Sequence, residues 1–221
     1  MLFNLLGQPE KLVRDITPRL INKEANRALA MKFDVEYFDG TREQGYGGYR
    51  YDGRWQPVAA RLIERYQLHG TSKFLDVGCA KGFLMHDLSE ACPGIEVAGL
   101  DVSAYAKAHA LESAREAITL GSCLSLPYPD DYFDAAVAIN TLHNLAYDEC
   151  KHSVRELMRV TKNKSNLFIQ VDAYCNDDEK ALFETWMLTA KTYLKPEEWE
   201  ALFAEVGYQG DYFWTIIGFG G

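Results

Sequence analysis

Short apolar runs and longer amphipathic stretches alternate along the chain. The apolar runs, which suit strands buried on both faces of a parallel sheet, lie at 74–77, 95–101, 117–120, 133–139 and 167–171. Stretches with helical periodicity separate or follow them at 57–69, 82–91, 103–115, 147–160, 178–191 and 196–206. This alternation predicts an α/β fold built around a mostly parallel, doubly wound sheet.

The last stretch of the chain changes the expected number of strands. Residues 208–219 form strands readily, but no turn residues lie between Tyr212 and Ile217. We therefore expect one strand here rather than an antiparallel pair. The sheet should have six to seven strands, and six is the preferred number.

The part of the chain before residue 57 has a different pattern. Between residues 9 and 31 a helical period is interrupted at Pro18, which predicts two short helices. These helices would cover a substrate mouth or a partner subunit, or would pack on the main domain as an appendage. We therefore divide the chain into an N-terminal unit, 1–56, and an α/β domain, 57–221.

The segment 33–55 is rich in tyrosine, arginine and glycine. Glycine gives the chain mobility, while tyrosine and arginine join a large contact face to a polar tip. This composition suits a lid over a polar ligand, so we expect an N-terminal helical lid. The alternative is a surface loop in which tyrosines stack on arginines. The candidate ligand contacts are Tyr46, Tyr49, Arg50 and Trp55.

Composition narrows the class of protein. The 221 residues are 48% hydrophobic and carry a net charge of -9, which allows one well-filled core and argues against a nucleic-acid surface. The five cysteines include no C-x-x-C pair, so neither a disulfide framework nor a metal site is expected. Cys79, Cys123 and Cys175 are interpreted as small buried hydrophobic residues. Without a membrane-length apolar run or a basic leader, we expect a cytoplasmic protein.

The stretch 73–88, KFLDVGCAKGFLMHDL, contains the turn most suited to binding a ligand. Asp76 ends a buried strand, and Gly78 and Gly82 precede a helix. Such glycines permit a tight turn and close approach of a ligand. A dinucleotide fingerprint counted from Gly78 requires glycine at 80 and glycine or alanine at 83, and neither position matches. The G-x-x-x-x-G-K-S/T loop of nucleoside triphosphate sites is also absent.

A second acidic residue ends the next strand. Asp101 follows the turn by about twenty residues, the spacing at which an acid reaches ribose hydroxyls in nucleoside-binding folds. Its two carboxylate oxygens can accept from both hydroxyls at once. The alternative is that Asp101 only caps the helix beginning near Ser103.

The hydrophobic-Asp-x-Gly-x-x-x-Gly turn resembles motif I of the class I S-adenosylmethionine-dependent methyltransferases, in particular their small-molecule, type 11-like members. The run 121–145 (GSCLSLPYPDDYFDAAVAINTLHNL) and the link 159–169 (RVTKNKSNLFI) resemble later segments of that family. The resemblance covers about 57–217. Ala80 stands where a further glycine is usual, and Ser122 stands where an aspartate commonly meets the adenine amino group.

The resemblance implies that 57–221 is a Rossmann-like domain that binds S-adenosylmethionine and releases S-adenosylhomocysteine. The implied cofactor contacts are Asp76, Gly78, Cys79, Ala80, Gly82, Asp101, Val102, Ser122, Cys123 and Asn140. In this family the segment before motif I often reaches the carboxylate of the cofactor's methionine part. Tyr49 or Arg50 would do so here.

The family places its methyl-acceptor pocket at the carboxyl end of the central strand, 133–139. Methyl transfer from a sulfonium is a direct displacement, so the protein must mainly align the reacting atoms. Asn140 and His143 are the candidate catalytic residues. His143 would be a general base for a hydroxyl acceptor, because imidazole titrates near neutral pH, or it would only pack beneath the cofactor. Asp172 and Tyr174 are further candidate substrate contacts.

The expected acceptor is an oxygen or nitrogen atom of a small polar metabolite or sugar derivative. The N/D-P-P-Y/F motif of many enzymes that methylate nucleic-acid amino groups is absent. A non-catalytic module that binds the cofactor and a partner protein stays open, as does a nicotinamide-dependent oxidoreductase. We expect no nucleic acid, membrane or metal partner, and a monomer or homodimer.

Overall fold

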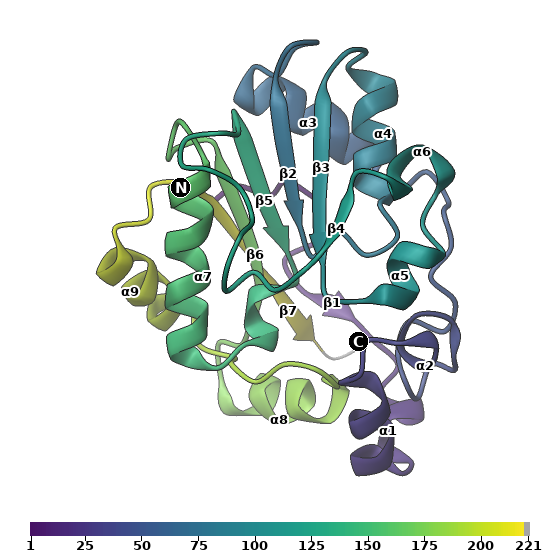
Figure 1. Cartoon of the computed structure of the whole chain (residues 1–221). Helices are drawn as coiled ribbons and strands as arrows, with labels where there is room; N and C mark the ends of the chain where they lie inside the picture. Colours follow the sequence, from purple (N-terminus) through teal and green to yellow (C-terminus); the bar gives the residue numbers. More distant parts are fainter. Residues whose placement is uncertain (219–221) are drawn as a thin grey trace.

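A computed structural model describes residues 1–218, and its centre is a parallel seven-stranded sheet (Figure 1). The strands are β1 (Leu12–Val13), β2 (Lys73–Val77), β3 (Glu96–Asp101), β4 (Ile118–Leu120), β5 (Ala135–Ile139), β6 (Leu167–Ala173) and β7 (Asp211–Gly218). Their order across the sheet is β1-β7-β6-β5-β2-β3-β4, and every pairing is parallel. The order reverses at β2, where ligand crevices form in open α/β sheets.

The helices form layers on the sheet and a group at its carboxyl edge. They are α1 (Lys23–Ala30), α2 (Val35–Asp39), α3 (Gln56–Tyr66), α4 (Phe83–Ala91), α5 (Ala104–Ala108), α6 (Glu112–Arg115), α7 (Tyr147–Val160), α8 (Asp177–Trp186) and α9 (Pro196–Val206), with 3₁₀ turns η1 (Thr17–Leu20) and η2 (Leu142–Asn144). Asn176 caps α8 by accepting from the Glu179 amide, and Gly207 ends α9 at φ +73°.

The alternation of side chains along each strand builds two hydrophobic layers. In β2, Leu75 and Val77 pack with α7 and α9, whereas Phe74 faces α3 and α4. All three side chains are fully buried, as expected for parallel strands covered on both faces. The buried positions of the central strands therefore accept few side chains other than apolar ones, and polar residues are left to the strand ends.

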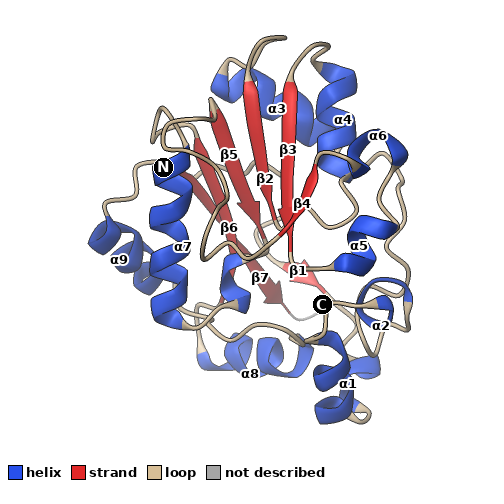
Figure 2. Ribbon diagram, in the orientation of Figure 1, coloured by secondary structure: helices blue, strands red, loops and turns tan. Residues whose placement is uncertain are grey.

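The carboxyl ends of all the strands meet at one edge, toward which the arrowheads in Figure 2 point. Helices α1, α2 and α8 gather at that edge (Figure 1). The amphipathic α8 packs on β7 and η1, so the segment before α3 and the segment after β6 meet here.

The structure corrects three expectations for the elements. Residues 9–31 contain the strand β1 before η1 and α1, so they are not two helices only. Because β1 pairs with β7, the sheet has seven strands rather than the preferred six. The single helix expected over 103–115 is two short helices, α5 and α6. The final strand is confirmed as a single one over Asp211–Gly218, and residue 219 lies outside the described residues.

Candidate functional site

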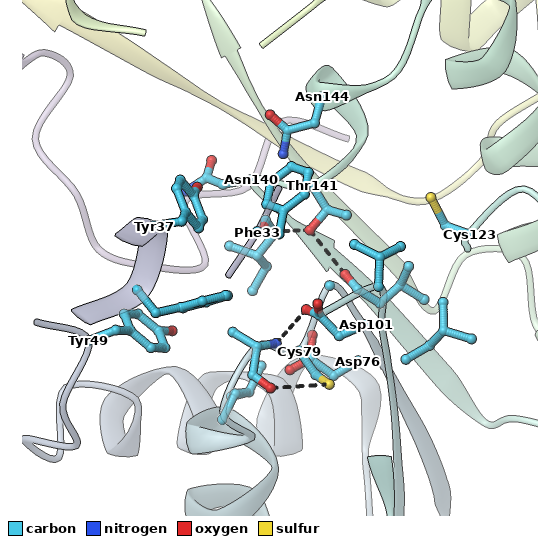
Figure 3. A pocket seen from close by; sticks show the side chains of 18 of the residues that line it. Phe33, Tyr37, Tyr49, Asp76, Cys79, Asp101, Cys123, Asn140, Thr141 and Asn144 are labelled. Atoms are coloured by element: carbon cyan, nitrogen blue, oxygen red, sulfur yellow. Dashed lines mark hydrogen bonds between the residues drawn. The ribbon is translucent and has the colours of Figure 1, made fainter. Parts of the chain in front are cut away.

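A cavity of about 550 Å³ opens at the carboxyl edge of the sheet (Figure 3). Its walls come from the ends of β2, β3 and β5, from the loop after β4, and from the segment 33–55. This size is typical of sites for cofactors and other drug-sized molecules. The cavity therefore lies where the sequence predicted a ligand.

The glycine turn after β2 forms the floor of this cavity. Gly78, Ala80 and Gly82 all have positive φ, at +81°, +49° and +72°. Gly78 and Cys79 donate their amides to the Leu100 carbonyl, at 2.7 and 3.2 Å, so the turn is bound to β3. A Cβ added at Gly78 would lie 2.0 Å from Thr141 Oγ1. Close packing of two strand ends therefore requires glycine at 78.

The carboxylate of Asp101, at the end of β3, is bound to the glycine turn. The side chain of this residue lies in the cavity wall (Figure 3). Its Oδ2 accepts from the Ala80 amide and its Oδ1 from the Ser103 amide, each at 2.8 Å. Burial raises the pKa of this carboxyl group, although these amide bonds oppose the shift. The residue lines the cavity, and a carboxylate oxygen can accept more than one hydrogen bond. The helix cap itself is Ser103, whose hydroxyl accepts from Ala106.

Asp76 lies at the end of β2, inside the same wall. Its side chain is buried and accepts no hydrogen bond within residues 1–218. Burial, and then the neighbouring charge of Asp101, raise its pKa from 3.8 to about 7. The carboxyl group is therefore poised to respond to a positive charge in the cavity.

The central strand β5 ends in a left-handed residue. Asn140 has φ +52°, and its Oδ1 accepts from Thr215 Oγ1 at 3.2 Å. Thr141 donates to the Val77 carbonyl at 3.2 Å, which ties the end of β5 to β2. Asn140 lines both the first cavity and a smaller neighbouring one, so it lies between them.

The segment 33–55 is held against the glycine turn by a buried lysine. Lys81 Nζ lies 2.6 Å from Asp39 Oδ2 and donates to the Tyr49 carbonyl at 3.0 Å. Tyr49 stacks on Phe83 with ring centroids 4.9 Å apart. The Ser103 hydroxyl donates to the Phe33 carbonyl at 2.5 Å. The segment thus covers the start of α4 and α5.

His143 lies in the smaller cavity, not the larger one. Its Nδ1 accepts from the Asp172 amide at 3.1 Å, and its Nε2 lies 3.3 Å from Asp172 Oδ2. The first contact requires a bare Nδ1, so the neutral ring carries its proton on Nε2, facing the carboxylate. Burial raises the pKa of Asp172, although His143 and Arg14 oppose that shift.

The structure brings most of the predicted site residues together. Twelve of the sequence-predicted contacts line the larger cavity: Tyr46, Tyr49, Trp55, Asp76, Gly78, Cys79, Ala80, Asp101, Val102, Ser122, Cys123 and Asn140. Three residues, Arg50, Gly82 and Tyr174, line neither cavity. Arg50 is exposed, and a Cβ at Gly82 would meet Ala114 at 2.6 Å, so that glycine serves helix packing.

Arg14, Arg54 and Asn144 line the larger cavity but were not among the predicted contacts. Arg54 belongs to the arginine-rich segment, in which no sequence signal distinguishes one arginine from its neighbours. Arg14 follows β1, and no sequence signal indicated that this strand joins the sheet.

Cysteines take no part in a metal site within residues 1–218. Cys79 and Cys123 are buried as expected, but Cys175 is exposed, which corrects its interpretation as a buried residue. Across the described residues, no three His, Cys, Asp or Glu side chains converge as metal ligands. None of the helices described is both long and apolar enough to cross a membrane.

The doubly wound sheet, the cavity at its switch point and the acidic end of β3 define a nucleoside-cofactor-binding α/β protein. Comparison with known families is more specific. Residues 75–169 match the family model described as a methyltransferase domain. Over these residues the chain is similar to the class I S-adenosylmethionine-dependent methyltransferases, and a domain of this kind implies S-adenosylmethionine as the cofactor.

One relative of the chain is named as an enzyme that methylates tRNA. A tRNA (carboxymethyluridine(34)-5-O)-methyltransferase of Arabidopsis thaliana is 32% identical over 147 residues, which cover 66% of this chain and 34% of that protein. This chain therefore spans about a third of that relative's length.

Two solved structures share the fold. The protein solved in complex with the Haloferax volcanii Trm112 methyltransferase activator has a TM-score of 0.55 at 20% identity, over 71% of this chain and 73% of that one. The cyclase SpnF has a TM-score of 0.57 at 22% identity, over 91% of this chain and 74% of that one. At such identities the likeness concerns the fold alone.

The cavity fits S-adenosylmethionine in its polar atoms as well as its volume. Two buried polar atoms in its wall, Trp55 Nε1 and Asn144 Oδ1, have no hydrogen-bond partner within the described chain. Buried donors and acceptors are rarely left unpaired, so both are open to a bound molecule. Together with the Asp101 carboxylate they provide donors and acceptors for a cofactor that carries hydroxyl, amino and carboxylate groups.

Proposed function

We propose that this chain transfers the methyl group of S-adenosylmethionine to an oxygen or nitrogen atom of a small polar metabolite or sugar derivative. The observation that supports a small acceptor best is the neighbouring cavity of about 170 Å³, which shares Arg14, Tyr37, Tyr46 and Asn140 with the cofactor cavity. An acceptor there would face the cofactor across Asn140.

In this proposal Asp101 accepts hydrogen bonds from the ribose hydroxyls, and the glycine turn supports the nucleoside with bare backbone. Ser122 and Cys123, after β4, lie on the adenine side. Arg54 and Tyr49 are better placed than Arg50 for the methionine carboxylate, because both line the cavity. Bound S-adenosylmethionine supplies an activated methyl group, so the protein's own contribution is alignment and exclusion of water.

We assign His143 a positioning role. Its Nδ1 lone pair is taken by the Asp172 amide, so the ring cannot accept an acceptor's proton there without breaking that bond. Its carbonyl accepts from the Lys191 and Thr192 amides, at 2.9 and 3.0 Å. The ring therefore ties the turn after β5 to the end of β6, and the backbone carbonyl of the same residue holds the segment after α8. The aligned acceptor then releases its proton to solvent or to the carboxylate of Asp172, in the smaller cavity.

The segment 33–55 is proposed to act as a lid, and residues 1–56 as the part that shapes the acceptor side of the site. The aromatic cluster of Phe38, Tyr46 and Tyr49 supports this, because its rings lie 4.6 to 6.0 Å apart and all three residues line the cavity. A cytoplasmic location and a monomeric or homodimeric state are part of the same proposal.

The second candidate function is methylation of an RNA base. The named activity of the Arabidopsis thaliana relative favours it, and the net charge of -9 opposes it, because RNA binding usually requires a basic surface. A module that binds the cofactor and a partner protein without transferring a methyl group is the third candidate. The nicotinamide alternative loses its basis, because similarity to the methyltransferase family accounts for the same crevice.

The test combines a binding measurement with a transfer measurement. Asp101→Ala should weaken S-adenosylmethionine binding by about 2 to 4 kcal/mol in calorimetry, because charge-assisted hydrogen bonds are lost. Asp148→Ala is the control, since its side chain is 92% exposed. Methyl-labelled cofactor is then incubated with small-metabolite fractions and with total tRNA. Label in the metabolite fraction supports the proposal, label in tRNA supports the second candidate, and binding without transfer supports the third.

A further inference from the structure

The smaller cavity at the carboxyl edge has an unusual concentration of arginine. Its wall includes Arg14, Arg19 and Arg42, which reach it from three separate parts of the segment before α3. All three guanidinium groups lie over the Trp186 ring, with Cζ atoms 5.7, 4.6 and 5.5 Å from its centroid. Three positive charges therefore surround one small space in a chain whose net charge is -9.

These arginines lack acidic partners. Within residues 1–218, none of the three lies within 4.0 Å of a carboxylate oxygen, whereas Arg54 and Arg65 are paired with Asp52 and Asp211. Arg42 donates to the Tyr46 carbonyl at 2.8 Å. Arg14 makes no hydrogen bond to the described chain. Acids are plentiful in this protein, so their absence here is a local property of the cavity.

Arg19 is the most informative of the three. Its side chain is only 5% exposed, and its Nη2 donates to the Gly45 carbonyl at 2.8 Å. Its Nε and Nη1 are buried and have no partner within the described chain. Burial, with the nearby charge of Arg42, lowers the pKa of Arg19 to about 10. A buried guanidinium with two unused donors is costly unless something else binds it.

The carboxylate of the cavity, Asp172, does not fill this role. Its Oδ2 lies 3.3 Å from His143 Nε2, on the strand-end side of the cavity. It attracts Arg14, whose charge opposes the rise in the pKa of Asp172, but no ion pair forms between them. The charge of the cavity therefore stays positive, with three guanidinium groups against one carboxylate that already faces an imidazole.

We propose that this cavity, which we call the arginine pocket (Arg14, Arg19, Arg42 and Trp186), binds the anionic group of the methyl acceptor, a carboxylate or a phosphate monoester. This inference rests on the proposed function and names its substrate class. Planar guanidinium groups bind both anions through paired N–H donors. Arg14 and Asn140 line both cavities, so an acceptor anchored in the pocket would extend toward the cofactor.

The dimensions of the pocket favour a small molecule over a polymer. Its volume of about 170 Å³ accommodates one carboxylate or phosphate group with part of its carrier. Its walls come from residues before α3, from the ends of β5 and β6, and from the segment after α8, so they close around it from several sides. Tyr37 and Tyr46, which are adjacent rings 5.1 Å apart, add hydroxyl groups to the same wall.

A purely structural role for the arginines is the competing explanation. Stacking on Trp186 would hold three segments together without any ligand. The two roles differ at Arg14, because its head contributes no hydrogen bond to the fold. Arg14→Gln should therefore leave the free energy of unfolding nearly unchanged and still weaken the binding of an anion.

The test measures anion binding directly. Inorganic phosphate and acetate are titrated into the whole chain at constant ionic strength, and the thermal midpoint and the heat of binding are recorded. We expect phosphate or acetate to raise the midpoint of the native protein, and Arg14→Gln and Arg19→Gln to reduce the affinity at least tenfold. Arg155→Gln, an exposed arginine on α7, removes the same charge and should keep the native affinity.

The outcomes separate this inference from the proposed function. The proposal that the arginine pocket binds an anion would be overturned by either of two results. The anions could affect the native protein and all three variants equally, or they could affect none of them. Binding of S-adenosylmethionine is measured in Arg19→Gln and Arg155→Gln, because neither residue lines the cofactor cavity, and it should change less than threefold. Loss of anion binding with cofactor binding retained supports the inference. A native protein that binds phosphate but not the cofactor would instead overturn the proposed function.

Discussion

At the scale of single residues, Asp76 shows how burial beside a like charge can tune a cofactor site. No hydrogen bond within the described chain stabilises its carboxylate, and its pKa is raised to about 7. The unfolded chain would release this proton near the ordinary value of 3.8. The folded protein therefore loses stability from Asp76 as pH rises from about 4 to about 7.

The corresponding prediction concerns Asp76→Asn. The amide cannot ionise, so the variant should be more stable than the native protein at pH 8 by about 2 to 4 kcal/mol, with the difference shrinking toward pH 4. Urea unfolding at a series of pH values measures this. A difference that does not depend on pH would show that the carboxyl group is not held in its protonated form.

Ala80 stands where the resemblance to methyltransferase motif I leads us to expect glycine, and its φ of +49° gives a physical reason for glycine there. A left-handed alanine costs about 1 to 2 kcal/mol. Glycine would remove this cost but lose a buried methyl group, worth about 0.8 kcal/mol, and gain freedom in the unfolded chain. The terms nearly cancel, so alanine is tolerated at position 80.

We therefore expect Ala80→Gly to change the free energy of unfolding by less than about 1 kcal/mol. Ala80→Val should lower it by about 2 to 3 kcal/mol, because a β-branched residue strongly resists a positive φ. Thermal or urea unfolding distinguishes the two. Equal stabilities for the valine and glycine variants would mean that the turn relaxes away from the left-handed region.

At the scale of elements, the segment 33–55 depends on one buried ion pair for its attachment to the glycine turn. Lys81 is 6% exposed, and its ammonium group joins Asp39 to the Tyr49 carbonyl. Removing the charge leaves Asp39 with the hydroxyl of Tyr105 and, within the segment itself, the amide of Tyr49. Most of the remaining contacts between this segment and α4 are then aromatic.

Lys81→Met should make the segment 33–55 more sensitive to chymotrypsin, because its tyrosines become accessible once the ion pair is lost. We expect cleavage to be several times faster than in the native protein and to be slowed when S-adenosylmethionine is added. Lys107→Met, on the neighbouring α5, is the matched control. The lid proposal fails if cleavage in the native protein is the same with and without cofactor.

The sequence predicted elements well where the information is local. Continuous apolar runs indicated β2, β3 and β5, and the glycines marked the turn because they need no distant partner to be recognised. Strand β1 has only two residues, so it shows no period, and it exists because β7 offers a partner more than two hundred residues away. The arginine pocket was missed for the same reason, since its members meet only after β1 joins the sheet.

At the scale of the whole molecule, the first residues of the chain belong to the core of the main sheet. Leu5 is completely buried and packs with Val58, Leu62 and Phe168. Phe3 donates its amide to the Tyr212 carbonyl at 2.9 Å. The division at residue 56 stays a prediction, but these contacts couple the stability of the two parts.

Leu5→Ala should lower the free energy of unfolding by about 2 to 5 kcal/mol, the range for a large buried side chain truncated to alanine. Leu2→Ala is the control, because its side chain is 55% exposed, and it should cost less than about 1 kcal/mol. Urea unfolding followed by fluorescence and circular dichroism gives both values. A negligible effect of Leu5→Ala would indicate that the N-terminal unit is only an appendage.

The uniform direction of the strands also has a practical consequence for protein engineering. Both cavities described lie at the carboxyl edge, whereas the turns before the strands, such as the exposed loop 163–165 ahead of β6, lie at the opposite edge. Loops of this kind tolerate added chain at little entropic cost. An affinity peptide or fluorescent reporter grafted into 163–165 would anchor the protein to a surface with its ligand openings facing the solution.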